Sequence, residues 1–181
     1  MLQGQYADSN LGRLIQQVLK TRKFALADFA PYAPSGNEPA AFVAKPILQG
    51  DSVLRVVVLQ LSMESINGIM KERTGLGKTG ETYLVGGDLL MRSESFRDPL
   101  NRSIQASFAH PDKGRVDTAA TREALAGNSG QEIITDYNGN QVLSAYAPVE
   151  LDGVTWALLA EINEAEAFAA VRDMEWLIAV V

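Results

Sequence analysis

The chain contains no cysteine and only one histidine, and both shortages exclude whole classes of site. Without cysteine there is no disulfide, no thiol nucleophile and no thiolate metal ligand, while every redox compartment stays open. His110 alone cannot build a histidine metal cluster. It precedes Pro111 in a polar stretch, where we expect an exposed loop residue.

Positive charge is scarce as well. Sixteen Lys and Arg residues stand against 22 Asp and Glu residues, which gives a net charge of -6 with no basic run. A nucleic-acid binder presents clustered Lys and Arg, so no nucleic-acid partner is expected. No nucleophile–base pair and no metal cluster can be assembled from the residues available, so we expect neither an enzyme nor a cofactor.

Long apolar runs are also missing. The opening residues, MLQGQYADSN, lack the basic start and apolar core of a signal peptide. Residues 174–181 turn apolar, and Trp176 stands where an interfacial aromatic anchor would precede a membrane helix. A spanning helix needs roughly 20 apolar residues. The segment is therefore either an amphipathic helix packed on its own domain or the entry to a membrane helix.

What is present is an ordinary folding composition, 46% hydrophobic and 21% charged, which can bury a core. Residues 10–22 have one apolar face at helical spacing, and Asp8 or Ser9 precedes them as a cap. The members of that face are Leu11, Leu14, Ile15, Val18 and Leu19. We predict a helix here.

Strand-like runs fill most of the remaining chain. Three come first, at residues 24–32, 40–48 and 53–61, and a helix follows from Ser62 to about Arg73. A central hairpin, 82–85 and 89–93, reverses at Gly86-Gly87-Asp88, because glycine accepts the positive φ of a short turn.

The second half of the chain also ends in three predicted strands followed by a helix. Residues 96–129 are irregular apart from a helix at 118–126, and strands follow at 131–137, 141–149 and 154–162. Asn163 then caps a last helix, with Glu166 in the capping-box position. Residues 154–160 are nearly all apolar, which predicts a strand covered on both faces.

Three strands and a helix thus occur twice, but only the second set is preceded by its own hairpin. We therefore interpret the first set as the back half of a module. The predicted division is into a partial first module, a linker helix, a complete second module and an exit helix, at residues 1–61, 62–74, 75–163 and 164–181.

Two phosphate-binding patterns are misleading. Gly75, Gly77 and Gly80 spell G-x-G-x-x-G, but they follow a helix and open a strand, the reverse of a dinucleotide site. Gly77-Lys78-Thr79 imitates a P-loop, yet Glu72 stands where the first glycine is required. We expect no nucleotide site.

The run GLGKTGETYLVGGDLLMRSES at 75–95 is similar to the hairpin that opens a Cache domain in bacterial transmembrane receptors. Gly87, Glu94 and Phe96 depart from the residues common there. DFAPYAPSGNEPAAFVAKPI and VVVLQLSMESINGIM resemble the end of the membrane-distal module of a double-Cache receptor. The resemblance runs from Tyr6 onward.

The resemblance implies an α+β fold: a PAS-like Cache module with a central antiparallel five-stranded sheet flanked by helices, preceded by a partial distal Cache module. It implies a homodimeric chemoreceptor in the inner membrane whose sensor region faces the periplasm and binds a small molecule, such as an organic acid or amino acid. Methyl-accepting chemotaxis is the implied output. The alternatives are the sensor of a histidine kinase or nucleotide cyclase, and a purely structural dimerisation module.

Arg92 lies in the central hairpin, where a buried arginine requires an anionic partner and its planar fork suits a carboxylate. Tyrosines on neighbouring strands can offer rings and hydroxyls to a small ligand. The candidate ligand-binding residues are Tyr83, Arg92, Ser93, Asp136, Tyr137 and Tyr146. The alternative is a structural ion pair between Arg92 and an aspartate such as Asp136, with tyrosines filling the core. We attribute Glu161, Glu164 and Glu166 to helix capping and the helix dipole.

Overall fold

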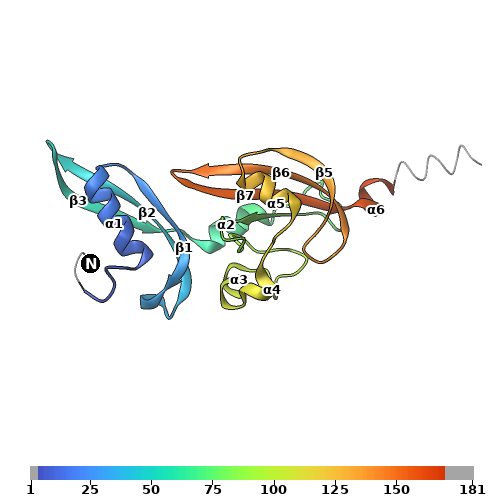
Figure 1. Cartoon of the computed structure of the whole chain (residues 1–181), viewed down its shortest axis with the longest axis horizontal. Helices are drawn as coiled ribbons and strands as arrows, with labels where there is room; N and C mark the ends of the chain where they lie inside the picture. Colours follow the sequence, from blue (N-terminus) through green and yellow to red (C-terminus); the bar gives the residue numbers. More distant parts are fainter. Residues whose placement is uncertain (1–3, 170–181) are drawn as a thin grey trace, which may run out of the picture. The chain divides into compact units, whose positions relative to one another are not determined.

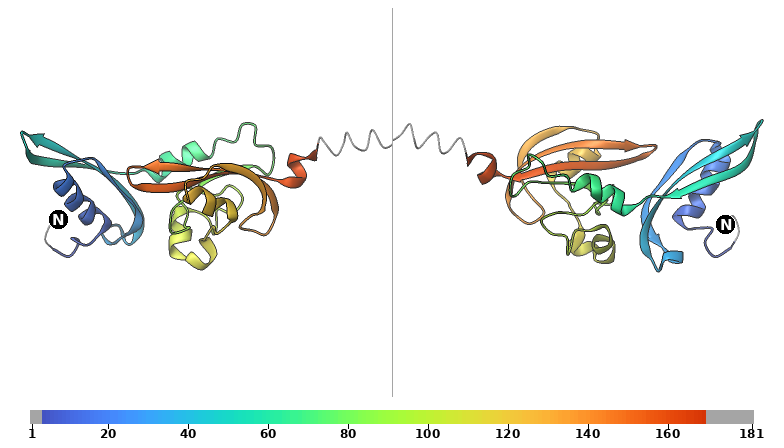
Figure 2. Two further views of the ribbon diagram at one scale, coloured as in Figure 1. Left: turned by 45° about the horizontal axis from the view of Figure 1, so that its top comes forward. Right: turned by 180° about the vertical axis from the view of Figure 1, so that it is seen from behind.

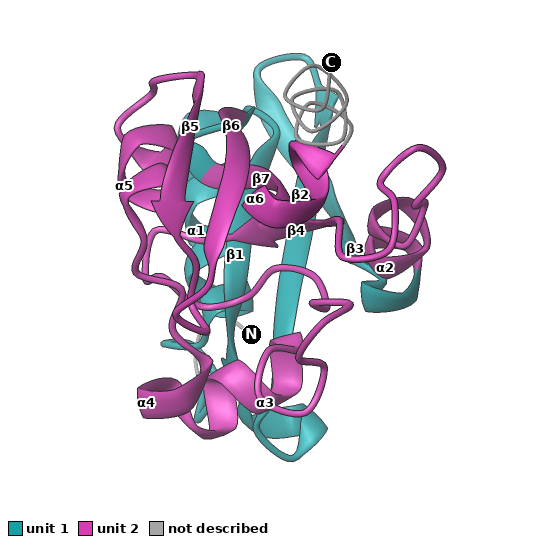
Figure 3. Cartoon of the chain, turned by 90° about the vertical axis from the view of Figure 1, so that its right-hand side faces the viewer, with its two compact units in different colours: residues 1–64, 150–155 teal, residues 65–149, 156–181 magenta. Residues whose placement is uncertain are grey.

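The computed structural model describes residues 4–169, and the chain divides into two compact units (Figure 3). Residues 1–64 with 150–155 form the first unit, and residues 65–149 with 156–181 form the second. Residues 4–169 contain no helix with the length and apolarity that a membrane span requires. The predicted membrane entry at 174–181 lies outside the described residues, and the predicted module boundaries stay a prediction.

The first unit is one helix packed on a three-stranded antiparallel sheet (Figures 1 and 2). Helix α1 (Asn10–Thr21) begins at Ser9, whose hydroxyl accepts a hydrogen bond from the Gly12 amide at 3.0 Å. The sheet order is β1 (Ala25–Tyr32), β2 (Glu38–Gln49), β3 (Ser52–Gln60), with the short 3-10 helix η1 (Ala33–Ser35) between β1 and β2. The predicted helix and strands are confirmed, with ends displaced by two residues or fewer.

The core of the first unit lies between α1 and one face of this sheet. Leu14 and Val18 of α1 are buried against Phe42 and Ala44 of β2. Strand side chains alternate between the two faces of the sheet. The side chains on the other face are also largely apolar, and these remain exposed. Leu59 is 64% exposed, and this face holds an apolar hollow of about 370 Å³. The hollow is lined by Phe24, Val43, Ala44, Lys45, Pro46, Ile47, Val57 and Leu59.

The second unit contains a four-stranded antiparallel sheet. Its order is β4 (Glu81–Val85), β7 (Val154–Asn163), β6 (Gln141–Leu151), β5 (Gly130–Thr135). The helices that follow α1 in the chain are short: α2 (Met63–Met70), α3 (Ile104–Ala109), α4 (Pro111–Gly114), α5 (Ala119–Leu125) and α6 (Glu164–Ala167). The predicted α+β class with antiparallel sheets is confirmed.

The predicted fifth strand at 89–93 is reduced to a single bridge between Val85 and Met91. Leu89 has φ 66°, which breaks the extended conformation where the strand was expected to begin. The Leu84 amide donates to the Ser93 hydroxyl at 2.9 Å, where a regular ladder would use a backbone carbonyl. A side chain thus ends the pairing that the hairpin turn begins.

Other differences also arise where side chains replace backbone partners. Helix α2 ends at Met70, short of Arg73, because the Glu72 carboxylate accepts the Thr74 amide at 2.9 Å and turns the chain. Helices α3 and α4 lie in the stretch expected to be irregular; the Ser103 hydroxyl caps α3. The predicted capping box of α6 is wrong, since Asn163 makes no capping hydrogen bond there.

The core of the second unit fills one face of its sheet. Tyr83, Val142 and Leu159 are buried there against Ala120 and Ala124 of α5. On the other face of β7, Leu158, Ala160 and Ile162 are only half-buried. The predicted cover on both faces is therefore incomplete. The Gly75-Leu76 loop lines a hollow of about 190 Å³ on this second face.

The two faces of the first sheet should respond differently to substitution. We expect Phe42→Ala, which empties a buried position, to cost about 3–5 kcal/mol of unfolding free energy. Leu59→Lys on the exposed face should change it by less than about 0.5 kcal/mol and reduce self-association. Urea unfolding followed by circular dichroism and sedimentation velocity measure the two effects. A large loss of stability in Leu59→Lys would mean that this face is covered in solution.

Candidate ligand site in the second unit

Two buried glutamates face each other across the sheet of the second unit. Glu81 of β4 is paired in register with Glu161 of β7, and their exposed fractions are 2% and 5%. Directly opposed residues in an antiparallel pair have Cβ atoms about 4.5–5.5 Å apart. Two buried carboxylates at that spacing require hydrogen-bond donors, cations or a proton.

Glu81 is satisfied entirely by donors from other parts of the unit. Its Oε2 accepts hydrogen bonds from the Ser95 hydroxyl at 2.8 Å and from the amides of Phe96 and Arg97 at 2.9 and 3.2 Å. Its Oε1 accepts a hydrogen bond from the Tyr137 hydroxyl. The loop that follows the central hairpin is therefore wrapped around this carboxylate.

Glu161 has fewer donors. The Ser144 hydroxyl of β6 donates to it at 3.0 Å. Burial, with smaller contributions from the charges of Glu81 and Asp136, raises the pKa of Glu161 to about 7, although hydrogen bonding to Tyr83 and Ser144 opposes the rise. This carboxyl group therefore takes up a proton near neutral pH.

Tyr83 and Tyr137 stand beside the glutamate pair. Their rings meet edge to face, with centroids 5.6 Å apart. Within the part of the chain that the structure describes, the buried Tyr83 hydroxyl makes no hydrogen bond of normal geometry. Burial, and then the charge of Glu161, raises the pKa of Tyr83. The Glu161 carboxylate lies next to this hydroxyl and interacts with it, so Tyr83 belongs to the glutamate network.

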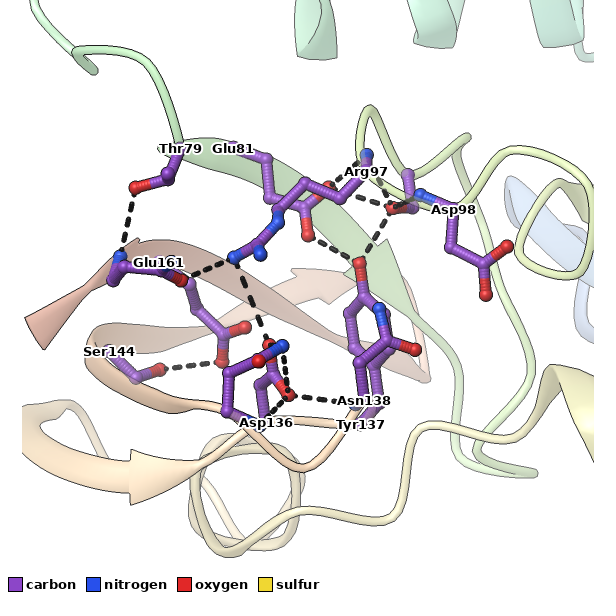
Figure 4. Close-up of polar contacts among 12 residues, drawn as sticks. Thr79, Glu81, Arg97, Asp98, Asp136, Tyr137, Asn138, Ser144 and Glu161 are labelled. Carbon is purple, nitrogen blue, oxygen red and sulfur yellow. Dashed lines mark hydrogen bonds and ion pairs between the residues drawn. The ribbon is translucent and has the colours of Figure 1, made fainter.

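Arg97 connects the glutamate pair to the end of β7 (Figure 4). Its Nη1 donates to Asn163 Oδ1 at 2.6 Å and lies 3.9 Å from Asp136 Oδ2. Asp136 also accepts the amides of Asn138 and Asn140, each at 2.8 Å. The loop that donates to Glu81 Oε2 thus also contacts the last residue before α6.

A second arginine closes the side of the site. Arg102 forms an ion pair with Asp98, and its guanidinium carbon lies 4.2 Å from the centroid of the Tyr137 ring. Arg102 is therefore balanced locally. Among residues 4–169, no group of three or more histidines and carboxylates is placed to hold a metal ion.

Three of the six predicted site residues lie in this network, namely Tyr83, Asp136 and Tyr137. Arg92 lies elsewhere: it is buried and pairs with Asp88 of its own turn, with Nη2 3.0 Å from Asp88 Oδ1. The alternative, a structural ion pair between Arg92 and an aspartate, is therefore confirmed, with Asp88 as the partner in place of the suggested Asp136. The side chain folds back because Gly86 has no Cβ; one built there would lie 2.2 Å from the guanidinium.

Ser93 and Tyr146 have structural contacts. The Ser93 hydroxyl accepts the Leu84 amide, as described above. The Tyr146 ring lies over Gly130, where an added Cβ would be 2.7 Å from the tyrosine hydroxyl oxygen. A part for Arg92, Ser93 and Tyr146 in ligand binding stays a prediction.

Sequence reasoning missed Glu81, Glu161 and Arg97. Attributing Glu161 to a helix start was wrong, because β7 continues to Asn163 and buries this side chain. The signal was present: Ala157, Leu159 and Glu161 share one strand face, so the glutamate continues a buried row. Arg97 gave no such signal, since nothing local in its sequence points to Asn163.

Glu161 should make stability depend on pH. Its pKa is about 7 in the folded protein against an ordinary value of 4.5, so the stabilisation is complete below about pH 4.5 and is lost as pH rises through 7. Relative to Glu161→Gln, the wild type should lose about 3 kcal/mol of unfolding free energy across this window. Urea unfolding at pH 5 and pH 8 measures it. Glu132→Gln, an exposed carboxylate on β5, is the control and should retain the wild-type pH dependence.

Arg92 should matter for stability. Arg92→Ala removes the partner of Asp88 and the donor to the Leu90 carbonyl, so we expect a loss of about 2 kcal/mol of unfolding free energy. Arg92→Lys keeps the charge but not the fork and should recover part of it. Chemical denaturation measures both variants. Equal unfolding free energies for the wild type, Arg92→Ala and Arg92→Lys would contradict a stabilising role for Arg92.

Comparison with known proteins gives a family. The family model described as "Cache domain" matches residues 6–171. No curated protein matches the sequence significantly. The chain resembles the periplasmic sensory domain of the Campylobacter jejuni chemoreceptor Tlp1, with a TM-score of 0.61 and 17% identity over 90% of this chain and 57% of that one.

Two further solved structures show the same likeness. The ligand-binding domain of Pseudomonas fluorescens CtaA with L-isoleucine has a TM-score of 0.56 and 18% identity, over 90% of this chain and 61% of that chain. The ligand-binding domain of Pseudomonas aeruginosa PctB with L-Arg has a TM-score of 0.54 and 21% identity, over 84% and 60%. These identities show a shared fold, and the chain spans less than two thirds of each domain. With residues 6–171 matched by the family model, the chain belongs to the Cache domain family of sensor domains.

Proposed function

We propose that the chain is the extracytoplasmic sensing region of a bacterial transmembrane chemoreceptor. A small molecule binds at the Glu81–Glu161 network of the second unit, and the signal passes through α6 to the membrane. Membership of the Cache family and the likeness to chemoreceptor sensor domains support the class of function. The proposed output is chemotaxis, from a homodimeric receptor whose sensor region faces the periplasm.

The observation that carries the proposal is the position of Arg97. Its backbone amide binds Glu81, and its side chain binds Asn163. Asn163 is the last residue of β7, and α6 begins at the next residue. A ligand that shifts Arg97 therefore changes a contact at the start of α6 with no intervening linker. Such a differential contact is what a binding event needs in order to bias two conformations.

The charges of the site favour a ligand that carries an ammonium group. Glu81, Asp136 and Glu161 bring three carboxyl groups to the network, of which Glu161 becomes charged as the pH rises through about 7. Arg97 is the cation that contacts this network, since Arg102 is paired with Asp98. The Tyr83 hydroxyl, next to Glu161, adds a polar group able to accept a hydrogen bond from that ammonium. L-Isoleucine and L-Arg, bound in the two Pseudomonas structures, are both amino acids. We therefore assign an amino acid or small amine as the ligand class.

Entry of the ligand requires movement, because Glu81, Tyr83 and Glu161 are all buried. The segment that can open is the loop after the hairpin, whose Phe96, Arg97 and Asp98 are exposed or half-buried. This loop holds Glu81 through two amides and one hydroxyl. Opening it to admit an amine would replace those donors with the ligand's own, and it would move Arg97 at the same time.

Binding can be tested by thermal unfolding with the standard amino acids and a matched acid without the amino group, such as leucine against 4-methylpentanoate. A ligand at 100 times its Kd should stabilise the protein by about 2.7 kcal/mol. Glu161→Gln and Tyr83→Phe should reduce that shift, while Glu132→Gln should keep it. Tyr83→Phe is an informative variant because it preserves the ring in the core and removes only the hydroxyl.

Two results would contradict the assignment. A wild-type protein that responds to no member of the panel would favour a purely structural dimerisation module. A ligand shift that survives in both Glu161→Gln and Tyr83→Phe would place the ligand elsewhere in the chain.

A further inference from the structure

The glycine-rich loop before β4 has its own partner in this structure. Carbonyl groups of the loop accept hydrogen bonds from one side chain, Arg73, and two of its amides donate hydrogen bonds to a second side chain, Glu166. Gly75 and Gly77 have φ 84° and 66°, so only residues without a Cβ adopt this path without strain. The loop is therefore shaped to present its amides.

Arg73 holds the carbonyl side of the loop. Its guanidinium donates to the carbonyls of Lys78 at 3.0 Å and of Gly80 at 2.9 and 3.0 Å. The guanidinium also lies over the Phe96 ring, 3.5 Å from its centroid. These contacts fix the loop whatever binds to its amides.

Glu166 of α6 occupies the amide side. Its Oε1 accepts the Lys78 amide at 2.7 Å, and its Oε2 accepts the Thr79 amide at 2.8 Å and also the Thr79 hydroxyl. The Thr79 hydroxyl oxygen in turn accepts the Asn163 amide at 3.1 Å, so Thr79 points toward the end of β7 (Figure 4). The hydrogen bonds to the loop lower the pKa of Glu166, which keeps it ionised.

The fit leaves no spare room. A Cβ added to Gly77 would lie 2.4 Å from Glu166 Oε1. Adjacent backbone amides that converge on one anion form a recurrent carboxylate- and phosphate-binding geometry. Here the anion belongs to the same chain, from a residue 87 positions further along.

We propose that the loop Gly77-Lys78-Thr79 is a carboxylate-binding site whose ligand is Glu166, and that this contact is a latch that fixes α6 to the sheet. The latch and the Arg97–Asn163 contact hold the start of α6 from two separate loops. The Glu166 carboxylate is therefore one of the two contacts that set the position of α6 on the second unit. The consequence for signalling rests on the proposed receptor function; the latch itself does not.

Chemical rescue tests the latch in the isolated protein. In Glu166→Ala, the Lys78 and Thr79 amides should lose their wild-type NMR shifts and exchange with solvent at least tenfold faster. Millimolar formate or acetate should restore both properties by binding in the emptied site, whereas chloride at the same ionic strength should not. Glu164→Ala, on the same short helix two residues earlier, is the matched control and should resemble the wild type.

Two further variants separate the latch from a loss of folding. Thr79→Ser keeps the hydroxyl and should retain the latch, whereas Thr79→Val should weaken it while the rest of the amide spectrum stays unchanged. Wild-type shifts and exchange of the Lys78 and Thr79 amides in Glu166→Ala would overturn the inference. So would a loosened loop that neither formate nor acetate restores.

The signalling consequence has its own readout. In a receptor that carries this sensor, Glu166→Ala should change the output measured without ligand, leave ligand affinity within about twofold, and differ from Glu164→Ala. An unchanged output together with loosened amides would overturn the role of the latch in signalling. Failure of the proposed function looks different, because the wild-type receptor would then not respond to any ligand.

Discussion

A buried carboxylate that needs donors shapes most of the second unit. Glu81 is almost fully buried and accepts hydrogen bonds from Ser95, Phe96, Arg97 and Tyr137. Leaving such a charge without donors would cost several kcal/mol, so the loop has to close over it. That closure places Arg97 beside Asp136 and Asn163, and it brings Tyr137 against Tyr83. The polar network follows from one charge in one strand.

Glu161 is also a buried carboxylate, but it has fewer hydrogen-bond donors than Glu81. It has Ser144 as a donor and Glu81 as its cross-strand neighbour, and its pKa of about 7 reflects that shortage. Glu161 and the neighbouring Tyr83 hydroxyl therefore have fewer hydrogen-bond partners than Glu81 has. We propose this glutamate, whose burial is the less well compensated, as the group that recognises the amine.

The start of α6 is held by contacts with two loops. Glu166 reaches the amides of Lys78 and Thr79, and Asn163 accepts from Arg97. Both contacts use groups that helix capping would otherwise occupy, which is why α6 has no capping box. A G-x-G-x-x-G pattern thus binds an anion after all, but a carboxylate of its own chain and not a nucleotide.

The sequence by itself determined the elements whose signals are local. The apolar face of α1, the Ser9 cap and the turns of the β6–β7 hairpin depend on neighbours a few residues apart, and each lies where its pattern indicates. The Cache resemblance likewise rests on a continuous run of residues. The central hairpin was only half predictable, because its turn is local whereas Ser93 ends the pairing by a side-chain contact.

Tertiary structure alone decided the site. Strand register sets Glu81 against Glu161, and the same fold brings Thr79 to Glu166 and Arg97 to Asn163 across long stretches of chain. It also turned Arg92 away from Asp136 and onto Asp88. A charged residue in a buried strand indicates that a partner is needed, but the sequence does not identify that partner. The partner depends on which groups the completed fold brings within about 3 Å. Local patterns therefore predicted where the strands run, and only their assembly decided which charges meet.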